Sequence, residues 1–239
     1  MTETNPPKKS DLGVRVLSAI VMVAAAGTAL WLGGWFWTVF VALVALGVLW
    51  EWTRLAFAFE KGPAGQAMWL LAGLVYIGSA ALTLILGRDE GLEFIIAVVI
   101  AVVAVDVGAY AFGRTLGGPK IAPSISPSKT WAGLLGGIVG AFSWIAGALV
   151  LYAGVRPTMQ VWIWALVAAV LIAVMAQAGD FFESWMKRKA GVKDSGTLIP
   201  GHGGLFDRVD GHLAVFALFG IVFLHRFLTY VPHSAPIVY

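Results

Sequence analysis

Three aspartates near the carboxyl end of the chain have the chemistry of a metal site. Asp180 follows a long apolar run, and Asp207 and Asp210 are spaced to share one face of a helix. A carboxylate at membrane depth is costly unless it is paired or bound to a metal. Carboxylate oxygens suit Mg²⁺, which also takes water and substrate phosphates. The sequence therefore predicts a magnesium site on these three aspartates, with either one ion or a pair that clamps a phosphoryl displacement.

A glycine-rich segment separates Asp180 from the other two aspartates. Its glycines let backbone N–H groups approach an anion closely, and lysine and arginine flank it. His202 is either a phosphate donor, an acid or base, or a structural residue, and the residues alone leave these roles open. The pattern predicts a phosphate-binding loop, and its candidate residues are Lys193, His202, Gly203, Gly204 and Arg208.

A helix that continues past Asp180 would present a polar face. Asp180, Glu183, Ser184 and Lys187 lie at positions i, i+3, i+4 and i+7, and Arg188 follows. The alternative is an interfacial helix end with solvated charges. The depth of Asp180 favours a functional face.

A second polar segment precedes this region. Asp106 lies within an apolar run, so we expect it to face a polar cavity. The loop that follows carries Ser126, Lys129 and Thr130 directly before another apolar run. A helix N-terminus at this point could bind an anion, although a basic loop that obeys the charge rule would look the same.

Membrane helices must position these residues. The 239-residue chain is 59% hydrophobic and 12% charged, which is far more apolar than an average soluble domain. The absence of cysteine excludes disulfides and thiolate ligands. Apolar runs of roughly the 20 residues needed to span a bilayer predict an all-α, polytopic transmembrane helical bundle of about seven to nine spans. A polar cytoplasmic catalytic loop lies between its last two spans. Seven spans are assigned to residues 14–32, 35–52, 68–87, 93–112, 131–153, 160–180 and 212–230.

The chain divides into three predicted parts. Residues 1–13 form a disordered cytoplasmic tail, 14–92 form N-terminal transmembrane helices, and 93–239 form a catalytic transmembrane region. The first apolar run is interpreted as a retained helix, with a cleaved signal peptide as the alternative. Glycines from Gly133 to Gly140 are spaced for close helix packing.

Charge distribution predicts the orientation. With the N-terminus in the cytoplasm, only Arg88, Arg156 and Arg226 of the 16 lysines and arginines fall outside. The active site is then cytoplasmic, and the protein is predicted to be integral to a bacterial inner membrane. No basic docking motif indicates nucleic acid as a partner.

Residues 184–210, SWMKRKAGVKDSGTLIPGHGGLFDRVD, closely resemble the signature of phosphatidate cytidylyltransferases, also called CDP-diacylglycerol synthases. Similar stretches are EWTRL from Glu51, DVGAYAFGR from Asp106 and SPSKTWAG from Ser126. The chain departs from the family pattern at Ser128, where the family has lysine, and at Ala132, where it has glutamate.

The resemblance implies transfer of a cytidylyl group from CTP to phosphatidic acid, which forms CDP-diacylglycerol and pyrophosphate with Mg²⁺. Membrane lipids are further partners, and a monomer and a homodimer both stay open. Alternatives are another CTP-dependent membrane lipid enzyme and an ion-coupled transporter.

The implied site comprises four catalytic residues and a wider substrate-binding set. The catalytic residues are Asp180, Lys193, Asp207 and Arg208, with the two cations on the triphosphate. Substrate-binding residues are Asp106, Ser126, Lys129, Thr130, Ser184, Lys187, Arg188, His202, Gly203 and Gly204.

Overall fold

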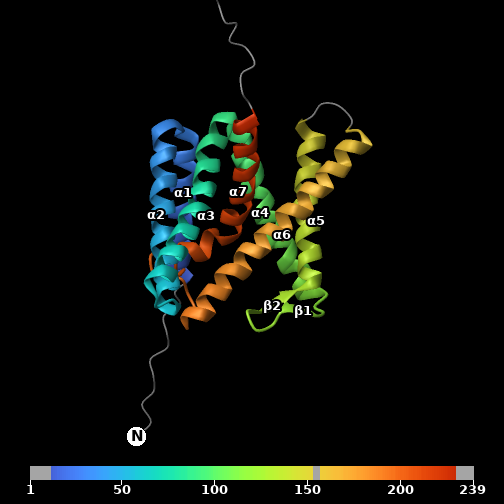
Figure 1. The fold of residues 1–239 in the computed structure, drawn as a ribbon. Helices are drawn as coiled ribbons and strands as arrows, with labels where there is room; N and C mark the ends of the chain where they lie inside the picture. The colour runs from blue at the N-terminus through green and yellow to red at the C-terminus, as the bar shows by residue number, and fades with distance from the viewer. Residues whose placement is uncertain (1–11, 153–156, 230–239) are drawn as a thin grey trace, which may run out of the picture.

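The structure, a computed structural model, describes residues 12–152 and 157–229, and the side chains through Ile221 except at 12 and 152. The predicted tail 1–13 lies outside this part, apart from residues 12 and 13, which begin the first helix. Figure 1 shows seven helices and one short hairpin in the described chain. Their bounds are α1 Leu12–Leu32, α2 Gly34–Phe59, α3 Pro63–Glu90, α4 Leu92–Thr115, β1 Lys120–Ala122, β2 Ser126–Thr130, α5 Trp131–Tyr152, α6 Met159–Ala190 and α7 Phe206–Thr229.

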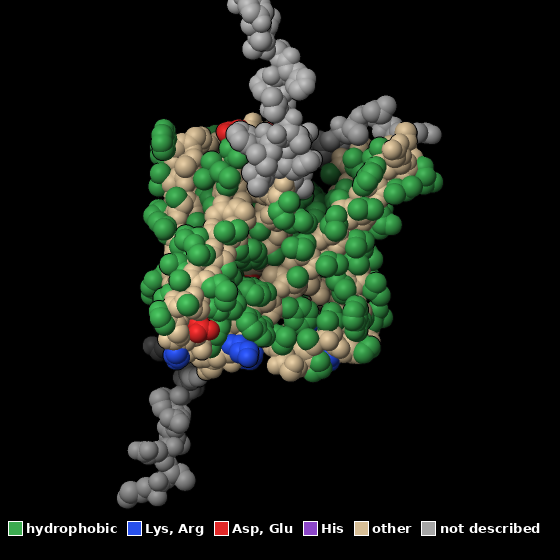
Figure 2. Space-filling view, in the orientation of Figure 1, with side chains coloured by type: hydrophobic (Ala, Val, Ile, Leu, Met, Phe, Trp, Pro, Cys, Tyr) green, Lys and Arg blue, Asp and Glu red, His purple; other side chains and the backbone are tan. Residues whose placement is uncertain are grey.

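Six of these helices, α1 to α6, are long and apolar enough to cross a membrane. The predicted transmembrane helical class is therefore confirmed. The seventh predicted span, 212–230, falls in α7, which begins with the charged residues Asp207, Arg208 and Asp210. Figure 2 shows the apolar flank of the bundle, with lysine and arginine side chains gathered at its lower rim.

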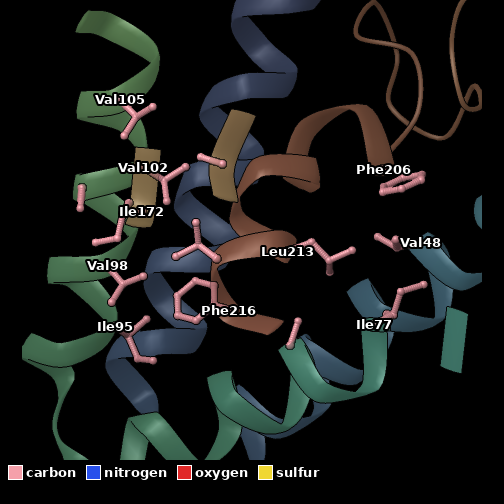
Figure 3. Close-up of a cluster of buried hydrophobic side chains, with 14 of the residues drawn as sticks. Val48, Ile77, Ile95, Val98, Val102, Val105, Ile172, Phe206, Leu213 and Phe216 are labelled. Carbon is pink, nitrogen blue, oxygen red and sulfur yellow. The ribbon is translucent and has the colours of Figure 1, made fainter. Parts of the chain in front are cut away.

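The interior of the bundle is built around α7, which packs on α3 and α6. Figure 3 shows apolar side chains of four other helices gathered around Leu213 and Phe216 of α7. Val102 of α4 and Val48 of α2 are fully buried in this core. The polar first turn of α7 is thereby fixed against the neighbouring helices.

Glycines bring α4 and α5 into backbone contact. A Cβ on Gly140 would lie 2.1 Å from the carbonyl oxygen of Ala104, and one on Gly136 would lie 2.4 Å from that of Gly108. Small residues permit such close approach between membrane helices. The predicted packing role of the glycines from Gly133 to Gly140 is confirmed at these positions.

The prediction of a purely helical fold is wrong for residues 120–130, which form an antiparallel hairpin. Lys120 pairs with Thr130, and Ala122 pairs with Ser126. Pro119, Pro123 and Pro127 interrupt this segment and disfavour a helix. Thr130 then caps α5, because its hydroxyl accepts a hydrogen bond from the N–H of Gly133 at 3.0 Å. The hairpin lies at the same end of the bundle as the end of α6 (Figure 1).

The sixth helix continues ten residues beyond the predicted end of its span. It runs obliquely through the bundle (Figure 1) and ends at Gly191, whose φ of 73° is the left-handed conformation of a helix C-cap. This extension gives the polar face that the spacing of Asp180, Glu183, Ser184 and Lys187 predicts.

Candidate active site

A polar cavity of about 460 Å³ lies where α6 ends and α7 begins. It gathers side chains from α4, α6, α7 and the loop between the last two. Eight predicted site residues line it: Asp106, Asp180, Lys187, Arg188, Lys193, Asp207, Arg208 and Asp210. Glu183, Asp194 and His212 also line it, although the sequence did not single them out as site residues.

Three carboxylates of this cavity come close together. Asp180, Glu183 and Asp210 each offer an oxygen, and these oxygens all lie within 4.8 Å of one another. Gly179 makes the arrangement possible, since a Cβ at that position would lie 2.4 Å from the backbone oxygen of Asp210. Helices α6 and α7 therefore touch at their backbones, and Asp210 is held beside Asp180.

The cluster lacks enough hydrogen-bond donors for its negative charge. Lys129 forms an ion pair with Asp180, and Lys187 lies 2.6 Å from Glu183 Oε2. Glu183 is only 1% exposed, and apart from this ion pair neither of its carboxylate oxygens has a hydrogen-bond partner in the described structure. Asp210 lies before the predicted span 212–230. Burial, together with the nearby Asp180 carboxylate, raises the pKa of the Asp210 carboxyl group to about 7. An all-oxygen set of three carboxylates with two lysines fits a hard divalent cation.

Asp207 has a different environment from the other two predicted metal ligands. Its Oδ1 accepts a hydrogen bond from Lys187 Nζ at 2.6 Å. Its Oδ2 accepts hydrogen bonds from the N–H and hydroxyl of Ser195, at 2.8 and 2.9 Å, and from the N–H of Gly204 at 3.0 Å. Asp207 thus fastens the loop to the start of α7 and to α6.

Glu51 of α2 is a second anchor of the same loop, and it is completely buried. Its carboxylate accepts hydrogen bonds from the Ser195 hydroxyl at 2.8 Å and from the N–H groups of Leu205 and Phe206 at 3.0 and 2.8 Å. A Cβ on Gly196 would lie 2.2 Å from this carboxylate. Glycine in the loop therefore serves close approach to a buried acid of the protein itself.

Similarity to known proteins identifies the family of this chain. Residues 58–226 match the cytidylyltransferase family. The chain belongs to that family. The phosphatidate cytidylyltransferase of Brucella suis biovar 1 (strain 1330) is 36% identical over 262 residues, which cover 90% of this chain and 95% of the relative. That of Rickettsia bellii (strain RML369-C) is 37% identical over 213 residues, covering 85% and 87%. That of Staphylococcus epidermidis (strain ATCC 12228 / FDA PCI 1200) is 40% identical over 159 residues, covering 66% and 60%.

The family match includes every residue that lines the polar cavity, but it begins after Glu51. Sequence reasoning noted the EWTRL stretch without assigning Glu51 a role. A glutamate inside the apolar run of α2 was the available signal, because an isolated charge at such a position requires a partner.

Two residues predicted to bind substrate have structural partners instead of facing the cavity. His202 Nδ1 lies 2.8 Å from the hydroxyl of Ser18, which joins the loop to α1. Gly203 has a φ of 85°, and Ile199 donates a hydrogen bond to its carbonyl at 3.0 Å. Both residues therefore shape the loop.

The hairpin contributes one side chain that reaches the acidic cluster. Lys129 pairs with Asp180 and lies 4.9 Å from the ring centre of Phe181. Ser126 and Thr130 are buried and lie outside the cavity lining, with Thr130 engaged as a helix cap. Ser184 donates a hydrogen bond to Asp180 at 3.3 Å, which orients that carboxylate.

Proposed function

We propose that this chain transfers a cytidylyl group from CTP to phosphatidate, which forms CDP-diacylglycerol and pyrophosphate. One observation carries the proposal. A single cavity places an under-partnered carboxylate cluster beside Lys187, Arg188, Lys193 and Arg208, at one end of a bundle of membrane-type helices. The names of the relatives specify the two substrates.

The reaction requires positioning and charge stabilisation more than proton transfer. A phosphate oxygen of phosphatidate attacks the α-phosphorus of CTP, and the bond from that phosphorus to the oxygen bridging the β-phosphate breaks. Pyrophosphate leaves with the electron pair. Because the attacking phosphate is already an anion at neutral pH, no strong base is needed.

We assign the metal to Asp180, Glu183 and Asp210. A Mg²⁺ ion held there would supply Lewis-acid stabilisation of the developing phosphate charge. The geometry supports Glu183 in place of Asp207, since the buried Glu183 carboxylate has only Lys187 as a partner whereas Asp207 accepts four hydrogen bonds. In this proposal Asp207 orients Lys187 and the loop. A second ion stays a prediction.

Lysine and arginine side chains would bind the substrate phosphates. We place Lys193 and Arg208 on the triphosphate, and Lys187 and Arg188 on the lipid headgroup or on CTP, because all four line the cavity. Lys129 would contribute a further positive charge from the hairpin. Asp106 lines the cavity from α4 and would face the nucleotide.

The cavity would face the cytoplasm of a bacterium whose inner membrane holds the protein. Support comes from the distribution of lysine and arginine, and CTP is a cytoplasmic compound. A homodimer likewise stays a prediction.

A direct test uses purified protein with CTP labelled at the α-phosphate, phosphatidate and Mg²⁺. We expect label in a chloroform-soluble CDP-diacylglycerol product, and none when phosphatidate or Mg²⁺ is omitted. Failure to form this product, alongside a related enzyme that works in the same vesicles, would refute the proposed function.

A further inference from the structure

A second cavity, of about 660 Å³, lies between α1 and the rest of the bundle. Nearly all of its lining is apolar. Ala19, Met22 and Ala26 of α1 form one wall, and Val41, Ile77 and Phe216 come from α2, α3 and α7. Short alanine side chains on α1 leave this space open. Helix α1 packs chiefly on α2, which lets the cavity extend along it.

The two cavities are neighbours that share lining residues. Arg208 and His212 of α7 line both the acidic cavity and the apolar one. Arg208 has no ion-pair partner within the described residues. Its positive charge therefore stands at the junction, where an anion can be bound while an attached apolar group extends toward α1.

The loop closes the same end of the apolar cavity. His202 lines that cavity and contacts Ser18 of α1 at 2.8 Å, and Ser18 also donates to the carbonyl of Pro200 at 3.1 Å. The apolar space thus begins at the catalytic loop and continues into the bundle between helices of membrane-spanning length. A site of this shape matches an amphipathic molecule with an anionic head and a long hydrocarbon part.

We propose that this apolar cavity holds an acyl chain of the phosphate-bearing lipid substrate, with its attacking phosphate next to the CTP triphosphate at Arg208. The inference rests on the proposed function and adds the place of the hydrocarbon part. CTP offers no group that would fill an apolar cavity, whereas a hydrocarbon chain matches the apolar lining. Residues on α1, outside the family match, would then set the chain-length preference.

The test compares two substitutions of the same residue type on one helix. Ala26→Trp fills the cavity, whereas Ala24→Trp places an equal side chain at an exposed position that does not line it. Each variant is assayed with dioleoyl and with dioctanoyl phosphatidate. We expect Ala26→Trp to raise the KM for the dioleoyl substrate about tenfold, with the KM for CTP and the rate on the dioctanoyl substrate kept. Ala24→Trp should change neither.

Equal effects of Ala26→Trp on both lipids, or no effect on either, would overturn the inference. A wild-type protein inactive on both lipids would instead refute the proposed function, so the two failures are distinguishable.

A second measurement needs no variant. Phosphatidate with a photoreactive group near the end of one acyl chain should label α1, α2 or α7 next to the cavity, and unlabelled phosphatidate should compete. Labelling that phosphatidylcholine displaces equally well would identify a bulk-lipid site and overturn the inference. A change of oligomeric state in Ala26→Trp but not in Ala24→Trp would indicate that a second copy of the chain occupies the cavity. That result would also overturn the inference.

Discussion

Two groups of acids lie side by side in this molecule, and they differ in the hydrogen-bond donors around them. Seven donor contacts from the protein reach Glu51 and Asp207, and the Ser195 hydroxyl is shared by the two acids. Asp180, Glu183 and Asp210 each have a carboxylate oxygen within 4.8 Å of the others, and the Glu183 carboxylate has only Lys187 as a partner in the described structure. A buried charge is stable only when it is compensated. The first group is therefore compensated as folded, whereas the second is the site proposed for a cation.

The largest effect of a substitution on activity is expected at the cluster of Asp180, Glu183 and Asp210. Asp210→Asn removes one proposed ligand, so we expect activity to fall by about 100-fold or more and Mn²⁺ affinity, measured by electron paramagnetic resonance, to fall with it. The unfolding temperature should not drop, because the change also removes repulsion from Asp180. Asp89→Asn, an exposed acid at the end of α3, is the control and should alter none of these. Unchanged Mn²⁺ affinity in Asp210→Asn would contradict the ligand assignment.

Glu51→Ala tests the two acids that anchor the loop, Glu51 and Asp207. It leaves the N–H groups of Leu205 and Phe206 without their acceptor and the Ser195 hydroxyl with Asp207 alone, and we expect stability to fall by about 3 kcal/mol. Thermal unfolding in detergent measures the loss. Mn²⁺ affinity of the folded fraction should remain near the wild-type value. The exposed Glu90→Gln serves as a control. A stable Glu51→Ala variant that lost metal binding would contradict the assignment of Glu51 to the loop and not to the metal.

Asp207→Asn decides to which group Asp207 belongs. As a loop anchor, it should lose about 2 kcal/mol of stability, because the ion pair to Lys187 is removed and the new amide presents N–H groups to N–H donors. Activity should fall through misplacement of Lys187, while Mn²⁺ affinity changes little. A drop in Mn²⁺ affinity as large as that of Asp210→Asn would restore Asp207 to the metal site.

The smallest effect of a substitution on stability is expected where the loop between α6 and α7 contacts α1. Ser18→Ala removes the contact to His202, and we expect a loss of about 1 kcal/mol. His202→Ala should cost about the same, and the double variant should cost little more than either alone. Fully additive losses, measured by thermal unfolding, would show that the two side chains are not coupled.

Much of the helical framework could be predicted from the sequence, because the length and hydropathy of each run are local properties. All seven helices overlap the predicted spans, and the polar face from Asp180 to Lys187 follows directly from the helical period. The hairpin was missed, since three prolines and four serines and threonines in 119–130 identify a break in the helix without specifying its pairing.

The sequence by itself determined that the chain spans a membrane, which acids and cations it offers for phosphate chemistry, and which family signature it carries. Only the tertiary structure decided how those acids divide. Glu51 and Ser195 are 144 residues apart, and their contact depends on α2 and the loop meeting in space. Whether a carboxylate is compensated depends on donors that come from distant segments. The spacing of Asp180, Asp207 and Asp210 in the sequence therefore does not show which of these carboxylates accept hydrogen bonds from the protein.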